Sequence, residues 1–235
     1  MSDKWVNPSI KDCERDNRSS ERIQFHIQGK EQKRPTNWLS ALRNPYFKES
    51  LISFLIDAWK SDEFANIIGR KTIVANCGDY CFKFFGDYSG MTREETPDMF
   101  CTHEEADTRM FFHLAGIIQP KNVVIRTADT DCLIIALANR RNYHVDTKIW
   151  LEVGTQTANT LRYINVNRLA LALGDTLVGA LPAFHALTGC DYTASFCRKA
   201  KIRPLKQLEK REDLQMALAS LGTESEDCDE TMKKN

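Results

Sequence analysis

Two aspartates follow an apolar run near the middle of the chain. The run is residues 123–125, and Asp129 and Asp131 separate it from a second apolar run, residues 132–137. We predict that the first run is a buried strand, because it is too continuous for a half-exposed one, and that the second run begins a helix. Open α/β sheets hold ligands where parallel strands end, so the two aspartates lie at a candidate site. Carboxylates at positions i and i+2 could then reach one cation. The structural alternative is a loop aspartate and a helix cap from Thr130 or Asp131.

A second set of acids begins near Thr102. Thr102-x-x-Glu105 matches a capping box, which gives Glu105 a structural role. Asp107 falls on the apolar stripe of the same predicted helix, where a carboxylate is costly without a partner. We expect Arg109 or a bound cation to be that partner. With Asp191, these acids are hard oxygen donors that suit Mg²⁺ or Mn²⁺, and two such ions about 3.5–4 Å apart could drive phosphodiester hydrolysis.

One basic cluster follows Asp191 and could bind a phosphate backbone. It consists of Arg198, Lys199, Lys201, Arg203 and Lys206. The formal net charge of the 235 residues is zero, so any footprint for nucleic acid has to be local.

The composition points to an intracellular protein with a real core. Hydrophobic residues make up 42% of the chain, and no apolar run approaches the ~20 residues of a membrane span. No signal-peptide pattern opens the sequence, so we expect no membrane partner. Eight scattered cysteines favour reduced thiols over a disulfide scaffold. The oligomeric state leaves no signal in the sequence.

Other site templates fit less well. The motifs GxGxxG, GxxxxGK[ST], GxSxG and HExxH are absent. Cys77-x-x-x-Cys81 and Cys101-x-His103 could be halves of a zinc site but lack the usual spacing of two close pairs. A strand followed by two aspartates also resembles a haloacid-dehalogenase phosphatase. In that family the pair lies on the first strand, and Asp175 lacks the second downstream carboxylate that the metal site expects.

The remaining patterns place these motifs on elements. We predict a charged segment at 1–34, a helical insert at 35–66, a hairpin of strands 72–75 and 80–84, a loop at 86–98, a strand at 148–153, helices at 166–174 and 183–188 with Pro182 opening the second, a closing helix at 208–221 and a disordered tail at 222–235.

Three motifs carry a resemblance in their order and spacing. Glu105-Ala106-Asp107, Asp129-Thr130-Asp131 and the LTGCDY of residues 187–192 resemble the Glu-Ala-Glu, Asp-x-Asp and Leu-Gly-Ser-Asp-Tyr-like elements of flap endonucleases, the XPG-type branch of PIN-like nucleases. Residues 3–22 look similar to that family's strand-ending Asp and charged arch helix. The wording HEEADTR, RTADTD and FHALTGCDYTASF is closest to a mostly uncharacterised animal subgroup, often met in transposon-like gene families. The resemblance covers roughly residues 1–203.

The resemblance implies an α/β, PIN-like (5'-3' exonuclease-like) three-layer fold over residues 1–207, with a mostly parallel sheet, helices on both faces and a short arch at 1–34. It also implies Mg²⁺-dependent cleavage of branched or single-stranded nucleic acid, DNA rather than RNA, in the nucleus. By position, one ion would be held by Asp3, Glu105 and Asp107, and the other by Asp129, Asp131 and Asp191. The four acids from Glu105 to Asp131 would form the catalytic centre.

One departure concerns the first strand. In the family a strand ending in a further metal-ligand Asp precedes the position of Asp3, whereas here only Met1 and Ser2 do. We therefore expect a truncated member whose sheet lacks that strand and has a bare edge. The alternative function is a non-catalytic module that keeps the fold and binds nucleic acid or protein. Metal dependence would separate the two.

Overall fold

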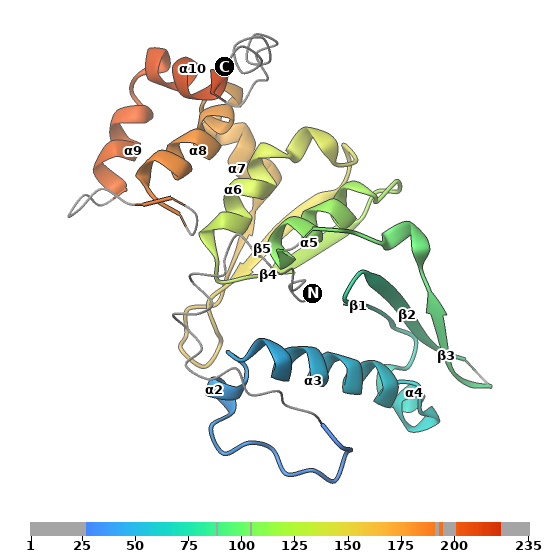
Figure 1. Ribbon diagram of the computed structural model, residues 1–235. Helices are drawn as coiled ribbons and strands as arrows, with labels where there is room; N and C mark the ends of the chain where they lie inside the picture. Colours follow the sequence, from blue (N-terminus) through green and yellow to red (C-terminus); the bar gives the residue numbers. More distant parts are fainter. Residues whose placement is uncertain (1–26, 88, 104, 191–192, 195–200, 222–235) are drawn as a thin grey trace, which may run out of the picture. The chain divides into compact units, whose positions relative to one another are not determined.

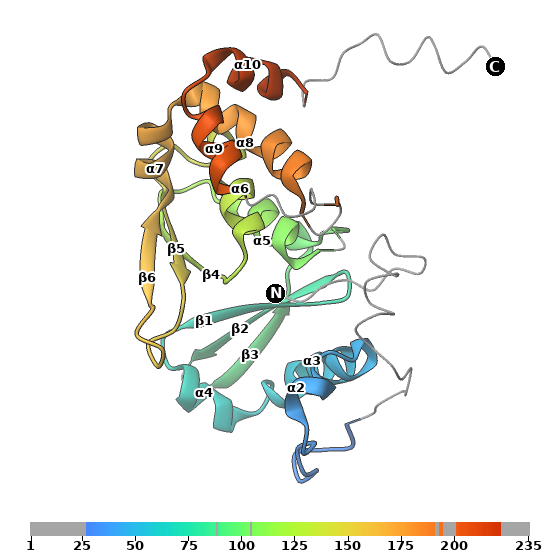
Figure 2. The same cartoon turned by 90° about the vertical axis from the view of Figure 1, so that its left-hand side faces the viewer.

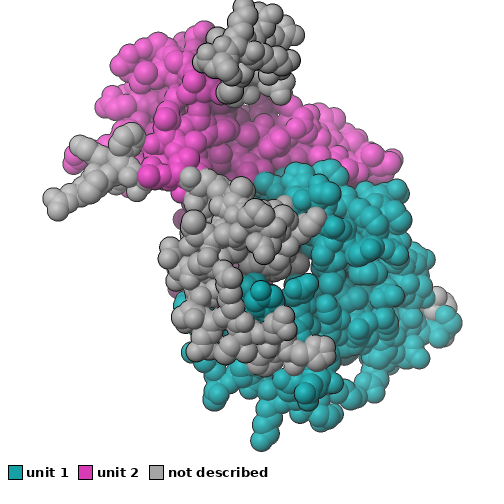
Figure 3. All heavy atoms as spheres, in the orientation of Figure 1, with its two compact units in different colours: residues 1–113 teal, residues 114–235 magenta. Residues whose placement is uncertain are grey.

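The chain divides into two compact units, Met1–His113 (unit 1) and Leu114–Asn235 (unit 2), coloured separately in Figure 3. The computed structural model describes residues 27–87, 89–103, 105–190, 193–194 and 201–221 (Figure 1). Most of the predicted charged segment 1–34 and the whole predicted tail 222–235 lie outside these residues.

The described part of unit 1 begins with three helices, which cover most of the predicted helical insert at 35–66. They are α2 (Trp38–Ala41), α3 (Pro45–Ala58) and α4 (Asp62–Ile68). Asparagines cap the first two: the Asn37 side chain accepts a hydrogen bond from the Ser40 amide, and that of Asn44 accepts one from the Phe47 amide, both at 3.1 Å. Pro45 follows its cap at the first helical position, where a missing N–H costs nothing.

An antiparallel meander follows the helices (Figure 1). Its strands are β1 (Thr72–Cys77), β2 (Tyr80–Asp87) and β3 (Gly90–Glu95), paired in the order β1-β2-β3. The predicted hairpin is confirmed, but the predicted loop at 86–98 is wrong because β3 lies within it. β3 reads GMTREE and has no apolar alternation, so only its pairing with β2 makes it a strand.

Helix α5 (Ala106–Ala115) starts later than the capping box predicted. The Arg109 amide and the Thr108 hydroxyl both donate to the Glu105 carbonyl, each at 3.1 Å, and Thr102 precedes the helix without joining it. The capping-box assignment to Thr102 and Glu105 is therefore wrong in register.

Unit 2 contains a mixed sheet with the order β4-β5-β6 among the residues that the structure describes. β4 (Asn122–Arg126) pairs parallel with β5 (Lys148–Val153), and β5 pairs antiparallel with β6 (Arg162–Asn165). β4 is an edge strand with Val124 54% exposed, so the prediction that this strand is buried on both faces is wrong. The α/β class is confirmed. The parallel part is limited to one strand pair, however, and the described strands form two small sheets.

Helices make up the rest of unit 2. They are α6 (Thr130–Ala138), α7 (Val166–Leu173), α8 (Asp175–Thr188), α9 (Ile202–Leu208) and α10 (Glu212–Ser220). α10 packs beside α8 (Figure 2). A core of Leu177, Ala180 and Leu208 is completed by Leu173, Phe184 and Leu218. Pro182 lies inside α8 instead of opening a helix. The closing helix predicted at 208–221 corresponds to α10, and α9 precedes it.

The described part of the chain holds no single helix long and apolar enough to cross a membrane. The two helices α7 and α8 meet the length and composition requirement only together, and they are bent by 103° where Gly174 separates them.

Candidate metal and nucleic-acid site

The two central aspartates lie where the parallel strand β4 gives way to α6. Asp129 is the N-cap of α6, and its Oδ1 accepts a 2.9 Å hydrogen bond from the Asp131 amide. The Asp129 amide in turn donates to Thr127 Oγ1 at 3.0 Å. The helix cap is therefore Asp129. The structural alternative had proposed Thr130 or Asp131 as the cap, and this assignment is wrong. Both carboxylates sit in the first turn, where the helix dipole favours negative charge.

A side-chain relay holds Asp131. Its Oδ1 lies 2.8 Å from His185 Nε2, and His185 Nδ1 lies 3.3 Å from Lys201 Nζ. An ammonium group only donates hydrogen bonds, so Lys201 donates to Nδ1 and the imidazole is left to donate through Nε2–H to Asp131. The side chains of His185 and Asp131 are 14% and 23% exposed, so the relay is sheltered but reachable from solvent.

The end of α8 brings His185 to this corner. α8 packs against α6, and His185 stands in its last turn. Beyond it, Thr193 Oγ1 donates to the Ala186 carbonyl at 2.6 Å, and the backbones of Cys190 and Thr193 pair with each other. Asp191, which falls between these two residues, lies outside the described residues.

The structure brings together only part of the predicted site. Asp129, Asp131 and Lys201 form one corner of unit 2, and Arg203 is exposed in the first turn of α9. Glu105 and Asp107 belong to unit 1, at the start of α5. The other predicted site residues, Asp3, Asp191, Arg198 and Lys199, lie outside the described residues.

Arg109 proves to be a structural residue. It is 1% exposed, and its guanidinium donates to the carbonyl oxygens of Gly78 at 2.9 Å, Cys101 at 3.2 Å and His103 at 2.9 Å. These bonds tie the β1–β2 turn to the residues before α5. The guanidinium was expected as a partner for Asp107, but these three bonds to backbone oxygens define its role.

Asp175 is also held structurally. Arg140 and Arg141 both bind its carboxylate, with Arg141 Nη2 at 2.9 Å from Oδ2. The hydrogen bond from Arg141 and the charge of Arg140 hold the pKa of this carboxyl below its usual range. Asp175 thus anchors the N-terminus of α8 to the segment after α6.

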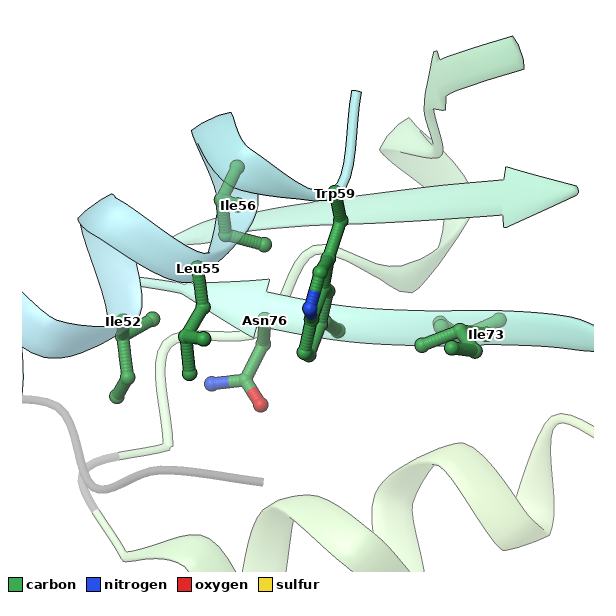
Figure 4. A pocket seen from close by; sticks show the side chains of 8 residues that line it. Ile52, Leu55, Ile56, Trp59, Ile73 and Asn76 are labelled. Carbon is green, nitrogen blue, oxygen red and sulfur yellow. The ribbon is translucent and has the colours of Figure 1, made fainter. Parts of the chain in front are cut away.

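A pocket of about 270 Å³ in unit 1 is lined by side chains that are unsuited to catalysis. It lies between α3 and β1 and is lined by Ile52, Leu55, Ile56, Trp59, Ile73, Val74, Ala75 and Asn76 (Figure 4). None of these side chains can act as an acid, a base or a nucleophile at ordinary pH. Asn76 is the single polar residue among them.

The corner of Asp129 and Asp131 offers two carboxylates to a divalent cation. Mg²⁺ commonly keeps several waters and takes one or two carboxylates from the protein. Each aspartate uses Oδ1 in a hydrogen bond, and no described residue donates one to either Oδ2. Over the described residues no group of three or more His, Cys, Asp or Glu side chains could hold a metal ion. A cation at this corner would therefore be held by two carboxylates and by water, and not by a closed cage of protein ligands.

Sequence reasoning missed His185 altogether and gave Lys201 only a phosphate-binding role. A signal was available, since His185 interrupts the apolar helical stretch 183–188 shortly before Asp191. What could not be deduced from spacing is that α8 packs against α6 and brings the imidazole to Asp131.

Comparisons with known proteins identify no relative. No family model matches the chain, and neither a curated protein nor a solved structure matches it. The function therefore has to be argued from the corner itself.

Proposed function

We propose that this chain is a nuclease-like domain that hydrolyses phosphodiester bonds in branched or single-stranded nucleic acid with Mg²⁺ or Mn²⁺. DNA is the preferred substrate in this proposal, and the nucleus is the site of action. The observation that carries it is the pair Asp129 and Asp131, which follows a parallel strand at the start of α6, with Asp131 held by His185 and His185 by Lys201.

Each residue of the corner has a distinct task. Asp129 and Asp131 would hold the cation through the oxygens turned away from their hydrogen bonds. A bound cation supplies an activated water and stabilises the leaving oxygen. His185 fixes the orientation of the Asp131 carboxylate, as hydrogen-bonded neighbours of metal ligands commonly do. Lys201 fixes the tautomer of His185 and puts a positive charge near the position of a bound phosphate.

The full proposal includes further ligands and a second ion. Asp3, Glu105 and Asp107 would hold that ion, and Asp191 would join Asp129 and Asp131. Arg198, Lys199 and Arg203 would bind the nucleic-acid backbone beside Lys201. These assignments rest on the family resemblance and remain predictions.

The test uses the full chain with a labelled 5'-flap DNA and a labelled single strand, titrated with Mg²⁺ and with Mn²⁺. Asp129→Asn is the informative variant, because asparagine caps a helix as well as aspartate does but carries no charge. We expect cleavage to fall at least about 100-fold with little change in thermal stability, since removing a single catalytic charge commonly costs that much. Asp146→Asn, at an exposed loop acid, is the matched control and should cleave like the parent.

A second candidate is the non-catalytic module, and it is favoured by the lack of a three-ligand metal group over the described residues. Binding of the same DNA without cations, with no cleavage at any cation concentration, would support the module. Cleavage that persists unchanged in Asp129→Asn would instead contradict the proposed catalytic role of the corner.

A further inference from the structure

A second pocket in unit 1 combines an apolar floor with a cationic rim. It measures about 250 Å³ and lies between the segment before α2 and one side of α3. Its apolar lining includes Ile27, Pro35, Trp38, Phe47, Leu51 and Phe54. The remaining lining residues are Gly29, Lys30, Gln32, Lys33 and Arg34.

The segment that forms the rim is folded against α3 by hydrogen bonds. The Ile27 amide donates to Ser50 Oγ at 2.9 Å, which ties the segment to α3. The Gln28 amide donates to Gln32 Oε1 at 2.7 Å, and the Gln32 amide donates to the Gly29 carbonyl at 3.2 Å. The rim is thus a defined turn, and the pocket has a fixed wall on each side.

Three cations share this rim with one acid, Glu31, which is exposed in the same turn and does not line the pocket. Lys30, Lys33 and Arg34 are all exposed, and the ion pairs of the described residues include none of them. Among the residues that the structure describes, no acidic side chain lines the pocket. Glu31 offsets one of the three positive charges within these five residues, and an anionic partner would offset the positive charge that is left.

The pocket's interior disfavours a nucleobase. The Arg34 guanidinium lies 5.5 Å from the Trp38 ring centre, and Phe47 meets the same ring at 5.5 Å in an edge-to-face contact. Trp38 is therefore already packed and is a poor stacking platform. The Oε1 of Gln32 is used within the turn, so the polar edge of a base would find few partners.

The volume of the pocket also limits which kind of ligand it can hold. At about 250 Å³ the pocket is smaller than the usual ~300–1,000 Å³ of small-molecule sites. That space suits one large apolar side chain, and the rim then faces the residues on either side of it. We propose that this pocket docks a short acidic segment of a partner protein, with one large apolar side chain inserted and flanking carboxylates facing Lys30, Lys33 and Arg34. This proposal does not depend on the proposed function.

The test measures binding of the full chain to a short fluorescent peptide that carries glutamates on both sides of one central phenylalanine. Three control probes are the peptide with serine for phenylalanine, the peptide with glutamines for glutamates, and a labelled oligothymidylate. We expect saturable binding of the first peptide that weakens with salt, and at least about tenfold weaker binding of the two altered peptides.

The variant Lys30→Glu/Lys33→Glu changes two exposed side chains and should leave the fold intact, which its thermal midpoint checks. We expect it to weaken peptide binding at least about tenfold, whereas Lys71→Glu, at an exposed lysine of the same unit outside the pocket, should bind like the parent. Equal binding by the rim variant and the parent would overturn the proposal. Tighter binding of the oligothymidylate than of the peptide, lost in the rim variant, would also overturn it and assign the pocket to nucleic acid.

Discussion

Two charged centres of this molecule are held in opposite ways. In unit 1, Arg109 is 1% exposed and donates only to backbone carbonyls. In unit 2, the Asp131 side chain is 23% exposed and is held by the side chain of His185, which is held by Lys201. One centre is enclosed by main chain, and the other is built from side chains that a ligand could reach.

The difference separates a charge fixed by the main chain from one that a ligand could reach. Backbone carbonyls do not change protonation state, so the bonds of Arg109 fix the β1–β2 turn and nothing more. The relay at Asp131 occupies one carboxylate oxygen and orients the other, which is how residues around a metal ligand commonly act. Removing the first centre should therefore damage stability, and removing the second should damage ligand binding.

The largest expected effect is that of Arg109→Met. Loss of the guanidinium leaves three carbonyl oxygens without their donor, and we expect the free energy of unfolding to fall by about 3–5 kcal/mol. Urea denaturation followed by tryptophan fluorescence measures this. Arg43→Met, at an exposed arginine of the same unit, is the control and should change the midpoint little. Equal urea midpoints for the two variants would show that the hydrogen bonds of Arg109 do not stabilise the fold.

The next effect concerns His185→Phe, which removes the hydrogen bond to Asp131 but keeps a ring in α8. We expect affinity for Mn²⁺, measured by titration calorimetry, to fall about 10–100-fold with a smaller change in stability. Lys201→Met should give a smaller loss, because Lys201 acts through His185. Lys206→Met is its matched control in α9. A His185 variant that binds Mn²⁺ like the parent would remove the relay from the site.

The sequence carried the local features of both centres but not their surroundings. The strand at β4, the helix after Asp129 and the hairpin at β1 and β2 follow from runs of apolar and β-branched residues. β3 was missed because its polar sequence becomes a strand only through pairing with β2. The register of α5 was misjudged because Thr102 and Glu105 fit a cap pattern that the chain does not use.

The site shows the same limit. Asp129 and Asp131 could be singled out from their place after a strand, since that signal is local. The partner of Asp131 lies 54 residues away in the chain, and one partner of Arg109, Gly78, lies 31 residues away, so tertiary packing selects both. Pro182 was expected to start a helix, yet α8 continues through it because packing against α10 outweighs the loss of one backbone donor.

The smallest expected effect is the contribution of His113, which lies near Arg109, to the pH dependence of the chain's stability. Burial, followed by the charges of Arg109 and His103, lowers the pKa of His113. Its ordinary pKa is about 6.5, so the unfolded chain takes up a proton on acidification before the folded chain does. Stability should therefore be complete above about pH 6.5 and decline as the pH falls below it. His113→Gln should flatten this decline in urea titrations, whereas His144→Gln should not.

The most direct test of the central claim is Mn²⁺ binding at Asp129 and Asp131, followed by the relaxation of water protons in the parent chain, Asp129→Asn and Asp146→Asn. The account predicts saturable binding in the parent and in Asp146→Asn, with bound water still exchanging, and a loss of at least about tenfold in affinity for Asp129→Asn. Identical titration curves for all three proteins would contradict a cation site at this corner.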